Sequence, residues 1–109
     1  MPKRVEGKVA IVTGGGSGMG RAGATLFAAE GAKVVVADID EAKAARVTQA
    51  ITSAGGEAVS IPVDVRSVES VKSLVAKTLE RFGRIDILYH NAVDVKFVNE
   101  QDQIGRAHV

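Results

Sequence analysis

Four short apolar runs alternate with three longer stretches along the chain. The runs cover residues 9–12, 33–37, 58–63 and 85–89. The first is β-branched and enters a glycine-rich loop, and the second contains Val34, Val35 and Val36 in succession. Uninterrupted apolar runs of this length are typical of strands in a parallel sheet that helices cover on both faces. We therefore predict that the first two runs form buried strands and that residues 58–63 and 85–89 form a third and a fourth strand.

The longer stretches carry apolar residues at the three- and four-residue spacing of one helix face. Asp40 and Ser67 are suited to cap the second and third helices, and Gly31 and Gly83 to end the first and third. The apolar positions expected to face the core are Met19, Ala22, Leu26 and Ala29; then Ala44, Val47, Ile51 and Ala54; then Val68, Val71, Leu74, Val75, Leu79 and Phe82.

The resulting order is β-α-β-α-β-α-β with short connections, and the chain length suits one domain. Strands that alternate with helices favour an α/β fold in which right-handed crossovers build an open parallel sheet with helices on both faces. We predict this Rossmann-like architecture.

A glycine-rich loop joins the first strand to the first helix. Gly14 can make the sharp turn, Gly18 can let the backbone approach a pyrophosphate, and Gly20 can let the helix pack against the strand. N–H groups at the start of a helix bind phosphates. The loop therefore predicts a dinucleotide cradle; a glycine turn without a ligand is the alternative.

The second strand ends in Asp38, 18 residues after Gly20. A carboxylate at this place accepts hydrogen bonds from the adenosine ribose hydroxyls and repels a 2′-phosphate. Its neighbours in the sequence, Ala37 and Ile39, are uncharged. We therefore expect NAD as the cofactor, not NADP. Asp38 could instead cap the following helix, but Asp40 is better placed for that role.

Three motifs together resemble the short-chain dehydrogenase/reductase family: Thr13-Gly14-x-x-x-Gly18-x-Gly20, Asp64-Val65 after the third strand, and His90-Asn91-Ala92-Val93 after the fourth. The resemblance runs from Lys8 to about Val93. It implies the strand order 3-2-1-4 in a truncated sheet and an adenine ring against Asp64-Val65. The cofactor-binding residues that we predict are Gly14, Gly16, Ser17, Gly18, Met19, Gly20, Asp38, Ile39, Asp64, Val65, Asn91, Ala92 and Val93.

The sequence departs from the family pattern at two positions of the third motif. His90 and Val93 replace the first Asn and the Gly of Asn-Asn-Ala-Gly, while Asn91-Ala92 can still line the cofactor. We expect His90 to be packed or locally hydrogen-bonded, and the resemblance implies no catalytic role for it.

The family's catalytic groups, an asparagine, a serine and a Tyr-x-x-x-Lys motif, follow the fourth strand. Tyr89 is the only tyrosine of this chain, it lies inside that strand, and Val93 stands four positions later. The resemblance thus implies the NAD(H)-binding N-terminal half of an oxidoreductase without catalytic residues. Its full-length parent would transfer hydride to or from a small-molecule alcohol or ketone and would form homo-oligomers.

Two other functions stay open. A stand-alone module could bind NAD without reacting, and a Tyr-x-x-x-Lys motif in the parent gene would exclude it. A methyltransferase-like fold also has a glycine loop and an acidic residue after its second strand, but the spacing from Thr13 and the Asp64-Val65 pair disfavour it.

Composition narrows the class of protein further. Basic and acidic residues number 14 and 13 and are interspersed, so no basic stripe indicates a nucleic-acid partner. Cysteine is absent, which excludes disulfides and thiolate metal sites. The N-terminus is charged, and the apolar run behind it is too short for a signal peptide or membrane span. We expect a cytoplasmic protein without membrane contact and without a metal site.

The last residues follow a different pattern. We expect residues 1–98 to form a partial dinucleotide-binding domain and residues 99–109 to be a polar tail, because this stretch has neither hydrophobic periodicity nor a helix cap. Residues 104–109, Ile-Gly-Arg-Ala-His-Val, match one reading frame of a common sequencing-library adapter. Two interpretations remain: an adapter-derived artefact with the natural sequence ending near Asp102, or an arbitrary tail.

Overall fold

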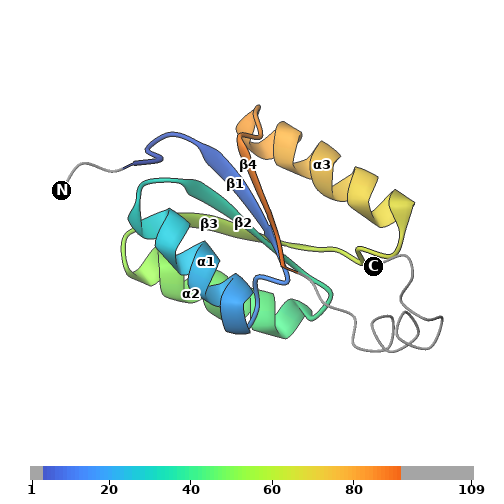
Figure 1. Ribbon diagram of the computed structural model, residues 1–109, viewed down its shortest axis with the longest axis horizontal. Helices are drawn as coiled ribbons and strands as arrows, with labels where there is room; N and C mark the ends of the chain where they lie inside the picture. Colours follow the sequence, from blue (N-terminus) through green and yellow to red (C-terminus); the bar gives the residue numbers. More distant parts are fainter. Residues whose placement is uncertain (1–3, 92–109) are drawn as a thin grey trace, which may run out of the picture.

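Four parallel strands form one sheet with helices on both faces (Figure 1). The structure is a computed structural model and describes residues 4–91. Its elements are β1 (Val9–Thr13), α1 (Gly18–Ala29), β2 (Lys33–Asp38), α2 (Glu41–Ser53), β3 (Glu57–Pro62), α3 (Val68–Phe82) and β4 (Ile87–His90). The order β3-β2-β1-β4 and the parallel pairing confirm the predicted Rossmann-like sheet.

The two faces of the sheet carry separate cores, because successive side chains of a strand point to opposite faces. Val12, Val34 and Val36 belong to the core beneath α1 and α2. Ile11 and Val35 belong to the core beneath α3. Figure 1 shows α1 and α2 together on one face and α3 on the other. Coverage of both faces explains the uninterrupted apolar runs in β1 and β2.

Helix α1 packs on the sheet through a different face from the one predicted. Met19 and Leu26 are 69% and 60% exposed, whereas Gly20 and Ala24 are buried. A Cβ atom on Gly20 would collide with the carbonyl oxygen of Gly14. The helix lies so close to the β1 loop that only the smallest residues fit between them. The prediction from hydrophobic spacing, which placed the larger apolar side chains of this helix in the core, is wrong.

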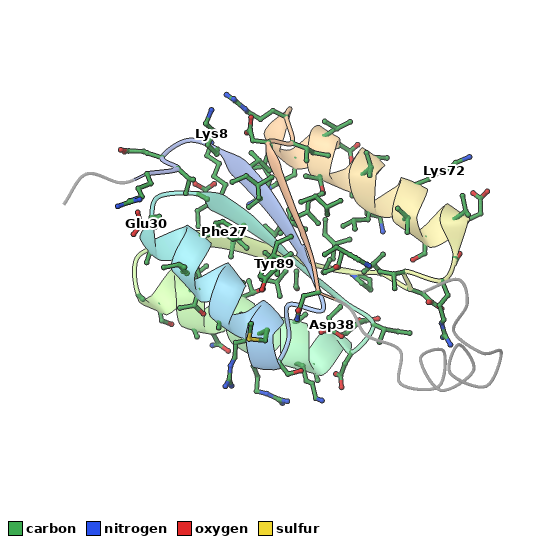
Figure 2. The ribbon with its side chains drawn as sticks, in the orientation of Figure 1. Lys8, Phe27, Glu30, Asp38, Lys72 and Tyr89 are labelled. Atoms are coloured by element: carbon green, nitrogen blue, oxygen red, sulfur yellow. The ribbon has the colours of Figure 1, made fainter. Side chains whose placement is uncertain are left out.

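Tyr89 lies between β4 and this same small-residue face of α1. Its ring meets Phe27 edge to face at a centroid distance of 6.0 Å (Figure 2). A Cβ atom on Gly23 would run into the Tyr89 ring. The tyrosine is half-buried, as expected of a core or edge residue.

Helix α3 buries less of its apolar stripe than predicted. Leu74 is 3% exposed and Thr78 is fully buried, its hydroxyl donating to the Leu74 carbonyl at 2.8 Å. The remaining apolar stripe is only partly covered: the exposed members are Val68 (68%), Val71 (36%), Val75 (38%) and Leu79 (45%). Periodicity predicts which side chains share a face, but how many of them are buried depends on what packs against that face.

Polar contacts fasten the start of β4 to β1. The Val9 N–H donates to Asp86 Oδ2 at 2.9 Å, and the Asp86 N–H donates to the Val9 carbonyl at 2.9 Å. Arg84 adds two hydrogen bonds of 2.8 Å, one to each carboxylate oxygen of Asp86. The hydrogen bonds from Arg84, followed by the one from Val9, hold the pKa of the Asp86 carboxyl below its ordinary value.

We expect this carboxylate to make the free energy of unfolding depend on acid pH. Because the folded-state pKa is lowered, the stabilisation is fully present above the unfolded-state pKa of about 3.9 and is lost as the pH falls through the folded value. Urea midpoints measured between pH 6 and pH 2.5 should fall less steeply in Asp86→Asn and in Arg84→Gln than in the unmodified protein. Identical slopes in all three would contradict the assignment.

Candidate nucleotide-binding site

The carboxyl ends of the four strands meet at one edge of the sheet. Thr13 pairs with Ala37 on one side and with His90 on the other, and Asp38 pairs with Pro62. Strand β1 lies between β2 and β4, so the chain order reverses at β1. Such a reversal is a topological switch point, where open α/β sheets bind ligands. Figure 2 shows Asp38 at this edge.

The glycine-rich loop leaves β1 at the switch point. Gly14 and Gly18 have φ angles of 66° and 58°, in the left-handed region that favours glycine. A Cβ atom on Gly18 would meet no atom within 4 Å, so the loop surface is open there. At Gly20 the Gly14 backbone blocks the same atom. The loop is therefore tightly packed at Gly20, where α1 meets it, and open at Gly18. This arrangement fits a backbone that a pyrophosphate approaches closely.

Helix α1 begins in this loop with Ser17 as its N-terminal cap residue. The Ser17 side chain caps no backbone N–H, and the first turn contains no acidic residue. The first N–H groups of a helix lack partners within it, and they carry the positive end of the helix dipole. The start of α1 therefore suits an anionic group.

The Asp38 carboxylate accepts one backbone hydrogen bond from the same loop and one from the cap residue of α2. Its Oδ2 accepts from the Gly16 N–H at 2.9 Å, and its Oδ1 accepts from the Asp40 N–H at 2.9 Å. Each oxygen of an ionised carboxylate can accept a further hydrogen bond. Asp40, not Asp38, caps α2, since its side chain accepts from the Lys43 N–H at 3.1 Å. The structure thus leaves Asp38 acceptor positions for a ligand beside the loop.

Lys43 is a neighbour of Asp38 that the sequence analysis missed. A Cβ atom on Gly16 would come within 2.8 Å of both Asp38 Oδ2 and Lys43 Cβ. The first turn of α2 thus brings a lysine beside the acidic residue, five positions away in the sequence. The sequence indicates only that a helix starts soon after the second strand, which does not by itself place Lys43 beside Asp38.

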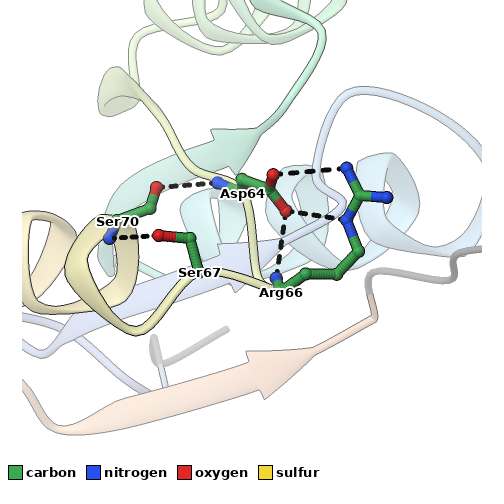
Figure 3. Close-up of polar contacts among 4 residues, drawn as sticks. All are labelled: Asp64, Arg66, Ser67 and Ser70. Atoms are coloured by element: carbon green, nitrogen blue, oxygen red, sulfur yellow. Dashed lines mark hydrogen bonds and ion pairs between the residues drawn. The ribbon is translucent and has the colours of Figure 1, made fainter.

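Asp64 follows β3, and Arg66 holds its carboxylate (Figure 3). Oδ1 accepts from the backbone N–H and the Nε of Arg66, both at 3.0 Å, and Oδ2 accepts from Nη2 at 3.2 Å. The side-chain hydrogen bonds of Arg66 and then its backbone hydrogen bond lower the pKa of the Asp64 carboxyl. The Val63 N–H donates to the Asp38 carbonyl at 3.2 Å. The segments that carry the two carboxylates are therefore adjacent.

His90 and Asn91 close the site from the side of β4. Thr13 Oγ1 is 2.8 Å from His90 Nδ1 and accepts a hydrogen bond of 3.0 Å from the Asn91 N–H. Which of Thr13 and His90 donates depends on the histidine tautomer. A Cβ atom on Gly20 would lie 3.1 Å from Asn91 Nδ2, so this amide lies against the glycine loop. The local hydrogen bond expected of His90 is confirmed.

The other predicted residues lie around the same edge. Met19 and Ile39 are 69% and 63% exposed beside the loop and beside Asp38. Val65 contributes to an apolar cavity of about 190 Å³ between α3 and β4, which Thr13 and His90 also line. Ala92 and Val93, like the predicted tail at 99–109, lie outside the described residues.

Residues 4–91 contain neither a metal-binding cluster nor a membrane-spanning helix. No three His, Asp or Glu side chains come together there as a metal ion would require. No helix in that part of the chain is long and apolar enough to span a bilayer.

A sequence model described as short chain dehydrogenase matches residues 8–104. The chain belongs to the short-chain dehydrogenase family. This assignment excludes the methyltransferase-like fold. Members of the family are oxidoreductases that use a nicotinamide cofactor, NAD or NADP.

Relatives within the family are similar over most of this chain. An uncharacterized oxidoreductase of Thermotoga maritima is 44% identical over 97 residues, which cover 89% of this chain and 38% of the relative. Tropinone reductase-like 1 of Erythroxylum coca is 48% identical over 91 residues, which cover 83% and 32%. The chain therefore spans between about a third and two fifths of the length of these relatives.

Solved structures of the family share the fold. A hydroxysteroid dehydrogenase from Escherichia coli superimposes with a TM-score of 0.82 at 38% identity, covering 84% of this chain and 39% of that one. A citronellol catabolism dehydrogenase of Pseudomonas aeruginosa gives a TM-score of 0.78 at 40% identity, covering 81% and 37%. Both likenesses support the short-chain dehydrogenase assignment through the fold as well as the sequence.

Proposed function

We propose that this chain is the NAD(H)-binding N-terminal part, between about a third and two fifths of the length, of a short-chain dehydrogenase-like oxidoreductase. One observation carries the proposal: the Asp38 carboxylate accepts the Gly16 N–H at 2.9 Å. This contact joins the acidic end of β2 to the glycine loop, so a ribose bound by Asp38 would lie next to a pyrophosphate bound by the loop. A phosphate on the ribose 2′ oxygen would meet the negative charge of Asp38, which favours NAD over NADP.

Each part of the site would hold one part of the dinucleotide. The loop and the first turn of α1 would hold the pyrophosphate through backbone N–H groups. Asp38 would accept hydrogen bonds from the ribose hydroxyls, and Asp64-Val65 would lie against the adenine. Asn91 would line the far side, where the predicted Ala92 and Val93 follow it. When bound, the cofactor supplies a nicotinamide ring that accepts or donates hydride.

We propose that chemistry on the substrate belongs to the rest of the parent protein. The motifs of this chain match the cofactor-binding part of the family pattern, while the family's Tyr-x-x-x-Lys motif has no counterpart in this sequence. The parent would be a cytoplasmic homo-oligomer acting on a small-molecule alcohol or ketone. The chain by itself should bind NAD without turnover.

Calorimetric titration of the full 109-residue chain with NAD, NADP and ADP-ribose tests this proposal. We expect binding of NAD and ADP-ribose with similar affinities, because the adenosine and pyrophosphate carry the contacts. NADP should bind at least about tenfold more weakly than NAD, a difference of about 1.4 kcal/mol. Equal or tighter binding of NADP would overturn the role of Asp38.

If the chain reduced NAD in the presence of an added alcohol, the proposal that the catalytic residues lie in the rest of the parent protein would be contradicted. The reading frame beyond Asp102 then separates the remaining alternatives. A Tyr-x-x-x-Lys motif there would support an oxidoreductase, and a complete gene without one would support a non-catalytic NAD-binding module.

A further inference from the structure

The loop after β3 holds one carboxylate in a fixed position. The Asp64 N–H donates to Ser70 Oγ at 2.8 Å, and the Ser67 hydroxyl accepts from the Ser70 N–H at 3.1 Å (Figure 3). The Ser67 N–H in turn donates to the Asp64 carbonyl at 2.9 Å. These contacts fix the backbone of Asp64 against the start of α3. The orientation of its carboxylate is left to Arg66.

The Arg66 guanidinium donates a hydrogen bond to each oxygen of the Asp64 carboxylate. Its Nε and Nη2 reach Oδ1 and Oδ2 at 3.0 and 3.2 Å, a bidentate arrangement that restricts rotation of the carboxylate about its Cβ–Cγ bond. The side chains of Arg66 and Asp64 are 57% and 35% exposed, so the pair lies at the surface of the site. A surface ion pair of this kind contributes little to folding. Substitution of Arg66 should therefore change the orientation of the carboxylate with little effect on the free energy of unfolding.

The acceptor positions on Asp64 are unequally used. A carboxylate oxygen can accept about two hydrogen bonds. Among the described residues, Oδ1 accepts two, from the Arg66 N–H and Nε, whereas Oδ2 accepts one, from Nη2. One acceptor position therefore remains, on Oδ2. It suits a ligand that offers a single N–H donor and repels one that offers an acceptor.

We propose that Arg66 is a positioning residue for base recognition, which orients Asp64 so that Oδ2 accepts one N–H of the adenine 6-amino group. The inference rests on the proposed NAD site and adds a residue to it. Asp64 is placed next to the Asp38 segment by the hydrogen bond from the Val63 N–H to the Asp38 carbonyl. A base attached to a ribose at Asp38 lies within reach of this position. Hypoxanthine, which carries an oxygen in place of the amino group, would place an acceptor against the carboxylate.

The test compares NAD with nicotinamide hypoxanthine dinucleotide in calorimetric titrations of the full chain. We expect the unmodified protein to bind NAD at least about tenfold more tightly than the hypoxanthine analogue. In Arg66→Met that ratio should fall to below about threefold, while the urea midpoint stays close to that of the unmodified protein. An unchanged ratio in Arg66→Met would overturn the proposal.

Two further variants separate the positioning role from charge alone. Arg84→Met is the matched control, because Arg84 grips Asp86 through Nε and Nη2 in the same way at the opposite end of β4; it should leave the ratio unchanged. Arg66→Lys keeps the charge but offers a single ammonium group instead of the planar fork. Arg66→Lys should therefore restore little of the preference for NAD over the hypoxanthine analogue. Full restoration would show that positive charge alone, without the planar guanidinium, is sufficient.

Two binding results separate the role of Arg66 from the existence of the NAD site. If the unmodified protein binds both dinucleotides equally while Asp38→Asn still weakens binding, the NAD site stands and the role of Arg66 is wrong. If the unmodified protein binds neither dinucleotide, both proposals are wrong.

Discussion

Replacing Gly20 by alanine is expected to destabilise the fold by about 3 kcal/mol, in the upper part of the range for overpacking, and to weaken NAD binding at least about tenfold. A Cβ atom at this position would overlap the Gly14 carbonyl oxygen and lie 2.6 Å from the Gly14 carbonyl carbon. A backbone obstacle cannot rotate away as a side chain can. The loop would have to move, and with it the N–H groups proposed to hold the pyrophosphate. Urea denaturation and NAD titration measure the two effects.

The sign of the stability change makes this prediction decisive. Alanine in place of glycine inside a helix normally stabilises by up to about 1 kcal/mol, so steric overlap and helix propensity predict opposite results. Gly55→Ala is the control, since Gly55 has a φ of 94° and a Cβ atom there would meet nothing within 4 Å. It should lose stability through backbone strain and bind NAD normally. An unchanged or raised urea midpoint in Gly20→Ala would show that α1 does not lie this close to the loop.

Replacing Asp38 by asparagine is expected to weaken NAD binding about 10- to 100-fold and to reverse the preference between NAD and NADP. Hydrogen bonds to a charged group are worth about 1.5–3 kcal/mol, which corresponds to this range. Asp38 accepts hydrogen bonds from the Gly16 and Asp40 N–H groups, one on each carboxylate oxygen. Asparagine has only one acceptor oxygen, so it cannot replace both oxygens. The loss of the negative charge removes the repulsion of a 2′-phosphate, and the nearby Lys43 then favours that phosphate.

Two comparisons complete this experiment. Asp40→Asn makes the same change of charge two residues away at the cap of α2; it should lower the urea midpoint and leave the NADP-to-NAD ratio unaltered. Adding Lys43→Met to Asp38→Asn should weaken NADP and leave NAD nearly unchanged. If Asp40→Asn shifted the ratio as strongly as Asp38→Asn, the preference would come from general charge and not from the ribose contact.

Much of the candidate site could be predicted because its signals are local in the sequence. Gly14, Gly18 and Asp38 follow the ends of predicted strands, and parallel strands bring those ends to one edge. The structure places them together through the contact between Gly16 and Asp38. Whether they bind NAD is still a prediction.

Lys43 and Arg66 could not be assigned to the site in the same way. The spacing of Lys43 from Asp38 has no periodic meaning, because β2 ends at Asp38 and α2 begins at Glu41, so the two residues lie on different elements. Arg66 is two residues from Asp64, a spacing that brings the side chains together only in the turn that the structure shows. Contacts of this kind depend on the path of the loop, which hydrophobic periodicity does not describe.

The sequence by itself determined the element order, the parallel sheet and the position of the glycine loop, since these follow from alternating apolar runs and from glycines at fixed offsets. The tertiary structure alone decided which face of α1 meets the sheet. Gly20 and Ala24 face inward and Met19 and Leu26 outward, because the distance between helix and loop favours small volume over hydrophobicity. That distance is set by the packing of α1 against β1, β2 and β4 together, and no single segment of the sequence contains it.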